Sequence, residues 1–88
     1  MKLKCEFVIT RIADEIVAVP VGESASSYHL VLKLNEESQK IVELLNHDTS
    51  VDEIADEIKK EYSIEDDKLK EYITGFIGQL KENGLIEE

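Results

Sequence analysis

Few side chains in this sequence have the chemistry of catalysis or metal binding, and they lie far apart. Cys5, His29 and His47 are the only cysteine and the only histidines, whereas zinc sites combine close pairs of such ligands. A nucleophilic Cys–His pair needs both groups within hydrogen-bond distance, and the sequence alone does not bring them together. No Gly-rich phosphate-binding loop is present. We therefore expect no catalytic residue, no metal site and no cofactor.

Residues 28–34 offer a different chemistry, the hydrogen bonding of an exposed backbone. Apolar residues occupy every second position from Tyr28 to Leu34, and this alternation predicts a β-strand. The segment contains no proline, and Lys33 is its only charged residue, so little in it opposes pairing with another chain. In such pairing, main-chain hydrogen bonds supply affinity and side-chain pockets select the partner. We predict that this strand is the binding surface.

The N-terminal third predicts the small antiparallel sheet to which this strand belongs. Residues 6–12 are rich in β-branched and aromatic side chains. Residues 13–15 suggest a short turn, and residues 16–21 are a nearly continuous apolar run. Strands joined by so short a turn pair as antiparallel neighbours. We expect the second strand at the centre, with the strand of residues 28–34 beside the second or the first.

Three helices are predicted after the sheet. Asn35 is a favoured N-cap for the first, over residues 36–46. Ser50 and Glu53 have the spacing of a capping box, in which each side chain accepts from the backbone of the other, at the start of the second. Gly84 ends the third by supplying a left-handed residue. The apolar stripe of this third helix consists of Leu69, Tyr72, Ile73, Phe76, Ile77 and Leu80.

The order of these elements predicts an α+β fold. Strands fall within about residues 6–34 and helices within about residues 36–83 of an 88-residue chain. That length supports one hydrophobic core, so we expect a single domain over residues 1–88. A three-stranded antiparallel sheet followed by three helices resembles a winged-helix arrangement.

The charge balance excludes several partners of such a fold. The chain has 20 acidic and 10 basic residues, a formal net charge of −10. Nucleic-acid and anionic-lipid binding depend on Lys and Arg, so we expect neither nucleic acid nor membrane as a partner. The N-terminus has no signal-peptide pattern, and Cys5 has no partner for an internal disulfide. These features favour a cytoplasmic protein that binds other proteins or peptides.

Gly75 and Gly78 interrupt the third predicted helix, where each glycine costs about 1 kcal/mol relative to alanine. One explanation is that a missing side chain lets a peptide or partner backbone approach closely. The other is that these are exposed positions that natural selection has not optimised for stability. The functional explanation is better for Gly75 than for Gly78.

Five short segments occur in an order that is more specific than any one of them. They are Val19-Pro20-Val21-Gly22, Lys33-Leu34-Asn35-Glu36, Ile41–Leu45, Val51-Asp52-Glu53-Ile54 and Glu82-Asn83-Gly84-Leu85-Ile86. From about Phe7 to Ile86, the chain resembles the PqqD-like proteins, also called precursor-peptide recognition elements. The resemblance implies a non-catalytic chaperone that binds the leader of a ribosomally made precursor peptide. It also implies a modifying enzyme as second partner, frequently a radical SAM maturase.

The resemblance further implies where the leader binds. In this family the leader adds a strand along the third strand, in a cleft bounded by the third helix. The candidate peptide-binding residues are therefore Tyr28, His29, Leu30, Val31, Leu32, Lys33, Leu69, Tyr72, Ile73, Phe76 and Ile77. Which face of the third strand meets the third helix is left open. The alternative function is a structural or regulatory interaction domain, with the same edge forming a dimer, so monomer and dimer both remain open.

Overall fold

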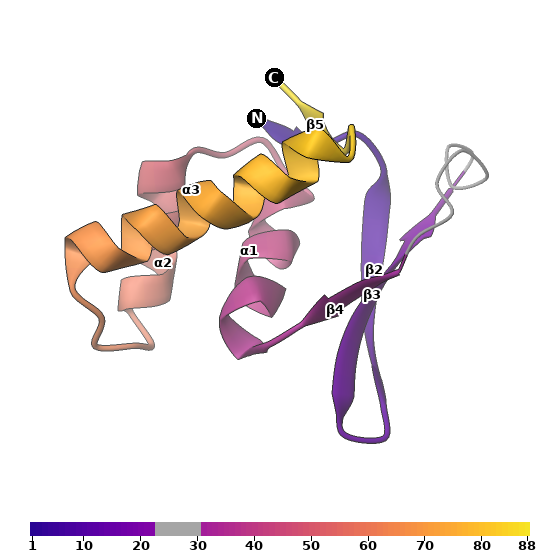
Figure 1. The fold of residues 1–88 in the computed structure, drawn as a ribbon, viewed down its shortest axis with the longest axis horizontal. Coiled ribbons are helices and arrows are strands. Elements are labelled where there is room, and N and C mark those ends of the chain that lie inside the picture. The colour runs from indigo at the N-terminus through magenta and orange to yellow at the C-terminus, as the bar shows by residue number, and fades with distance from the viewer. Residues whose placement is uncertain (23–30) are drawn as a thin grey trace.

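The computed structural model describes residues 1–22 and 31–88, and it confirms the α+β prediction. A three-stranded antiparallel sheet precedes three helices, and a two-stranded sheet joins the two ends of the chain (Figure 1). The predicted site residues Tyr28, His29 and Leu30 lie outside the described residues. The elements are β1 (Lys2–Leu3), β2 (Glu6–Ile12), β3 (Glu15–Val21), β4 (Leu32–Leu34), α1 (Glu36–Leu45), α2 (Val51–Lys59), α3 (Asp66–Glu82) and β5 (Ile86–Glu87).

The larger sheet has the order β2-β3-β4, so the second predicted strand is central, as expected. Of the two positions left open for the third strand, the structure has the one beside β3, with Ile16 opposite Leu34. The expected three-residue turn is wrong. Ile12 pairs with Glu15, so only Ala13 and Asp14 form the turn and Glu15 already belongs to β3.

Ala13 has a left-handed backbone, with φ of 56°, and left-handed backbone costs an L-residue about 1–2 kcal/mol. Tight hairpins prefer glycine where φ is positive. We therefore predict that Ala13→Gly raises the free energy of unfolding by about 1 kcal/mol, measured by urea denaturation. Ala55→Gly, within α2, is the opposite control and should lower it. Loss of stability in Ala13→Gly would contradict this account of the turn.

The core lies between the sheet and the three helices. Its side chains come from the helices' apolar faces, from β2 and β3, and from the ends of the chain. The most completely buried large side chains are Phe7, Ile41, Val42, Leu45, Ile54, Ile58, Leu69, Ile73 and Leu85. Leu32, Leu34 and Phe76 are partly buried against this core. Both α3 and β4 therefore pack on one hydrophobic core.

The end of α3 is as predicted. Gly84 has φ of 71°. Its N–H donates to the Lys81 carbonyl at 3.0 Å, and the Leu85 N–H donates to the Leu80 carbonyl at 2.9 Å. These two bonds are those of a Schellman motif, and Leu85 then packs into the core.

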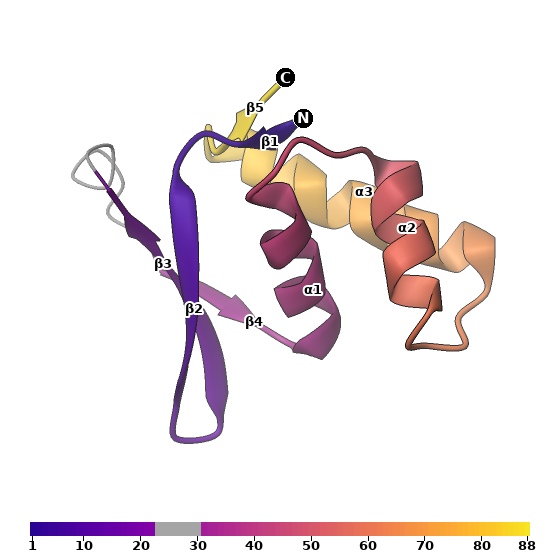
Figure 2. The ribbon, with the colours of Figure 1, turned by 180° about the vertical axis from the view of Figure 1, so that it is seen from behind.

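Several local predictions need correction. The sheet of β1 and β5 was not expected; Figure 2 shows it beside both termini. Ser50 accepts from the Glu53 N–H at 3.2 Å, but the Glu53 carboxylate accepts from Thr49 Oγ1 instead of returning the bond. The complete capping box lies at α1, where the side chains of Asn35 and Ser38 each accept from the other's backbone. The first helix ends at Leu45, one residue earlier than expected.

Candidate functional site

The strand register determines which backbone groups of the sheet face outward. In a two-residue hairpin the residues beside the turn share hydrogen bonds, and the pairs then alternate along the ladder. Ile12 and Glu15 flank the turn, so Phe7 belongs to a pair without mutual hydrogen bonds and its N–H and C=O face outward. The same alternation turns the Ala18 backbone toward Leu32 of β4. The N–H and C=O of Lys33 therefore face away from β3, at the free edge.

The outer edge of β2 is partly closed by a side chain. The Phe7 N–H donates to Asn46 Oδ1 at 3.3 Å, and Asn46 Nδ2 donates to the Phe7 carbonyl at 3.2 Å. These two bonds confirm that the N–H and C=O of Phe7 face outward. They also give both groups a hydrogen-bond partner within the chain. Asn46 follows α1 directly, so the end of this helix supplies the side chain that closes the β2 edge.

The edge of β4 is different. Among the described residues, no hydrogen bond reaches the outward N–H or C=O of Lys33. The Lys33 side chain is 78% exposed and lies 3.8 Å from the Glu15 carboxylate, an exposed ion pair of little energetic weight. An unblocked edge of this kind is a template for an incoming strand.

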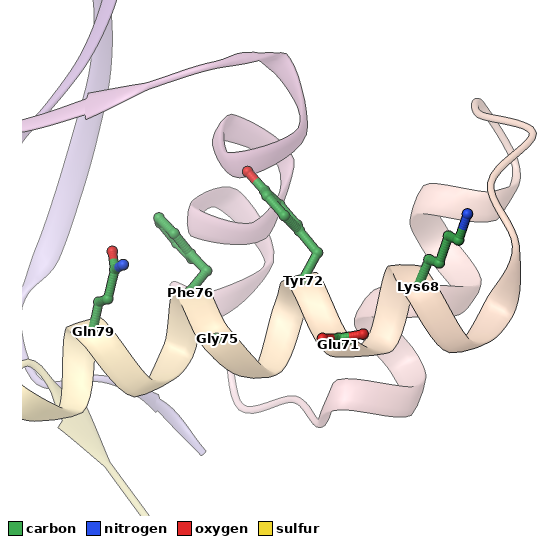
Figure 3. Close-up of a pocket in the computed structure, with 6 residues that line it drawn as sticks. All are labelled: Lys68, Glu71, Tyr72, Gly75, Phe76 and Gln79. Carbon is green, nitrogen blue, oxygen red and sulfur yellow. The ribbon is translucent and has the colours of Figure 1, made fainter.

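The helix α3 presents aromatic side chains on the side of this edge. Figure 3 shows Tyr72 and Phe76 pointing from α3 toward the end of β4 and the start of α1. Tyr72 is 41% exposed, and its Oη donates to Asn35 Oδ1 at 3.3 Å. Since Asn35 links β4 to α1, this hydrogen bond connects α3 to the residue that follows the free edge.

Two hollows lie along this side of α3, and Tyr72 and Lys68 line both of them. The first, which we call the α3 hollow, has a volume of about 510 Å³ and is lined by Lys68, Glu71, Tyr72, Gly75, Phe76 and Gln79 (Figure 3). The second, the junction cavity, has a volume of about 300 Å³ and is lined by Asn35, Glu37, Ile64, Lys68, Leu69 and Tyr72. Each is large enough for a side chain of a bound peptide.

The predicted site residues on α3 fall into two groups. Tyr72 and Phe76 line the α3 hollow. Leu69, Ile73 and Ile77 are at most 4% exposed, so they fix the helix to the core, and of the three only Leu69 lines a cavity beside the edge. That any of these side chains contacts a peptide stays a prediction.

The predicted site residues on the third strand also differ in their exposure. Leu32 and Leu34 are partly buried against the core that includes α3, whereas Lys33 is exposed. The face of β4 that carries the leucines is therefore the one turned to the core. Val31 is 57% exposed and lies just before β4 rather than within it. Contact of Val31, Leu32 or Lys33 with a peptide stays a prediction.

Two of the groups with a shifted pKa, Lys40 and Tyr62, lie where α1 meets the segment after α2. The hydrogen bond from Lys40 Nζ to Glu61 Oε1, 3.2 Å long, raises the pKa of Lys40. Burial, reinforced by nearby carboxylates, raises the pKa of Tyr62. These groups join α1 to the segment after α2. The described residues at the β4 edge instead offer backbone hydrogen-bonding groups and apolar side chains.

Two further observations bear on the kind of site. In residues 1–22 and 31–88, no group of three or more His, Cys, Asp or Glu side chains is placed to hold a metal ion. No helix among these residues is long and apolar enough to cross a membrane.

Sequence reasoning missed several residues around the edge. Asn46 has no local signal, because its bonds to Phe7 cross 39 positions. Lys68 and Gln79 do have one: together with Tyr72 and Gly75 they follow at intervals of four, three and four residues, which places them on one stripe of a helix.

Known proteins resemble this chain in sequence and in fold. The sequence profile of coenzyme PQQ synthesis protein D (PqqD) matches residues 15–86. The structure is similar to that of TbiB1 in complex with the TbiA(beta) leader peptide, with a TM-score of 0.71, 25% identity, and coverage of 99% of this chain and 95% of that one. It is also similar in fold to lasso peptide synthetase B1 complexed with the leader peptide, with a TM-score of 0.68, 24% identity, and coverage of 99% and 96%. No curated protein matches in sequence.

Proposed function

Because this chain belongs to the family of coenzyme PQQ synthesis protein D, we propose that it binds the leader segment of a ribosomally synthesised precursor peptide. The leader adds as a strand to the free edge of β4 and lies against α3. TbiB1, which shares 25% of its sequence with this chain over nearly the whole length, is described in complex with a leader peptide. The similarity to lasso peptide synthetase B1 supports the same fold.

One observation carries the proposal, the difference between the two edges of the sheet. Asn46 occupies the outward backbone groups of Phe7 on β2. The corresponding groups of Lys33 on β4 have no partner among the described residues, and the junction cavity beside α3 includes Asn35, the residue that follows β4. Strand addition uses such an edge for affinity and neighbouring pockets for selectivity.

The proposed role is binding and presentation, without catalysis by this chain. The second partner is the enzyme that modifies the precursor peptide, and a radical SAM maturase is our proposal for its class. The buried thiol of Cys5, which is free, suits a reducing compartment, so we place the function in the cytoplasm. Ordering a flexible leader offsets part of the binding energy, and we expect micromolar affinity, about −8 kcal/mol.

Reconstitution of peptide modification tests this role. A candidate precursor peptide and a candidate modifying enzyme, sought among the genes that neighbour the gene for this chain, are incubated with and without it, and modified peptide is measured by mass spectrometry. We predict that modification at low micromolar peptide requires the chain, since the enzyme alone does not hold the leader. Equal rates in both reactions would contradict the proposal. Sedimentation of the chain alone distinguishes the alternative, a dimer formed through the same edge.

A further inference from the structure

The α3 hollow includes a glycine, Gly75, in its lining. Every residue that lines it belongs to α3: Lys68, Glu71, Tyr72, Gly75, Phe76 and Gln79. In Figure 3 the side chains of Tyr72, Phe76 and Gln79 point to the same side of the helix, and the ribbon at Gly75 carries no side chain. The hollow therefore has an aromatic wall and a floor of bare helical backbone.

Nothing in the described protein explains why position 75 is glycine. A Cβ atom built on Gly75 meets no atom within 4 Å, and Gly75 does not have positive φ. Alanine would therefore fit, and it is the better residue in a helix interior. The same is true of Gly78, which also meets no atom within 4 Å but lines none of the hollows beside β4.

The α3 hollow shares lining residues with the junction cavity at the end of β4. Tyr72 lines both it and the junction cavity, and the Tyr72 hydroxyl is bonded to Asn35 at the end of β4. Side chains of an added strand alternate between the two faces of the sheet. Those on the face of Leu32 and Leu34, which pack on the core, turn toward α3.

We infer that Gly75 is a specificity-determining residue that leaves room in the α3 hollow for one bulky apolar side chain of the leader peptide. The aromatic rings of Tyr72 and Phe76 contact this side chain, and the bare backbone at Gly75 lets it approach the helix. The leaders that bind should therefore carry an aromatic or large aliphatic residue at one position facing α3. This inference rests on the proposed function and adds the class of side chain that the site selects.

The test compares Gly75→Ala with Gly78→Ala as its matched control. The probe is a fluorescein-labelled leader of the candidate precursor peptide used in the reconstitution, titrated by fluorescence anisotropy. Both substitutions should raise the melting temperature by about 4–8 °C, because each replaces a helical glycine. Gly75→Ala should nevertheless weaken binding about tenfold, since an added methyl overpacks the filled hollow. Gly78→Ala should leave the affinity unchanged.

A second measurement defines the side chain. A random peptide display library is selected separately on the wild type and on Gly75→Ala. We expect one position to change from bulky apolar residues on the wild type to smaller ones on the variant, because one methylene can decide selection between substrates. A leader in which that residue is replaced by alanine should bind the wild-type protein more weakly than the unchanged leader does. On the Gly75→Ala protein, the same replacement in the leader should reduce the affinity little further.

Three outcomes would overturn the inference while the proposed function stands. In the first, wild type and Gly75→Ala bind the leader equally. In the second, both glycine variants weaken binding to the same degree, which would indicate a general effect of the helix. In the third, Gly75→Ala binds the leader normally but slows its modification, which would assign the α3 hollow to the enzyme. If the wild type binds no leader, the proposed function itself fails.

Discussion

Replacing Lys33 by proline is expected to weaken leader binding by at least about 30-fold, or about 2 kcal/mol. The outward N–H of Lys33 is the donor that β4 offers to an added strand, as the pairing of β3 with β4 implies. Proline has no N–H, and its ring occupies the space of the incoming chain. A carbonyl of the bound leader then loses its partner, which costs about 1–3 kcal/mol. The measurement is titration of the labelled leader.

Lys33→Ala is the matched control. It removes the same side chain and its exposed ion pair with Glu15 but keeps the amide, so its affinity should stay within about threefold of the wild type. Proline is tolerated on an edge strand when its nitrogen faces outward, and circular dichroism checks that the fold is retained. If Lys33→Pro does not fold, N-methylation of alternate amides of the leader provides the same test from the other side. Equal affinity of the proline and alanine variants would contradict strand addition at β4.

The second large effect is expected at Asn46. Asn46→Ala should lower the free energy of unfolding by about 2 kcal/mol, because it leaves both the N–H and the C=O of Phe7 without their partner. Phe7 itself is 2% exposed, so water replaces these bonds incompletely. Urea denaturation measures the loss.

The control is Asn83→Ala, because Asn83 occupies the same C-cap position on α3 that Asn46 occupies on α1. Its side chain donates only to the Gln79 carbonyl, one turn earlier on an exposed surface. We expect a loss below about 1 kcal/mol. Similar losses in the two variants would show that capping, rather than closure of the β2 edge, accounts for Asn46.

Elements with a strong local pattern were predictable from the sequence. The strand Glu6–Ile12 has the predicted bounds, since a run of β-branched and aromatic residues is a local property. The end of α3 was predictable because Gly84 and Leu85 form a local motif. The pairing of β1 with β5 was not, because strands of two residues have no periodicity and the partners are more than 80 positions apart.

The candidate site was predictable only in part, for a physical reason. Leu69, Ile73 and Ile77 share an apolar stripe with Phe76, and periodicity alone does not distinguish the buried centre of a stripe from its margin. The structure buries the first three and leaves Phe76 partly exposed at the margin. The closed edge of β2 depends on Asn46, which lies far from Phe7 in sequence. Which edge is free therefore emerges only from the fold.

Amide hydrogen exchange at Lys33, followed by NMR with and without the leader, tests the central claim most directly. In the free protein this outward N–H has no partner among the described residues, and we predict that saturating leader slows its exchange at least about tenfold. The Phe7 N–H, already bonded to Asn46, should change little. Leader binding that leaves Lys33 exchange unchanged would contradict the account, because the peptide would then bind without adding a strand to β4.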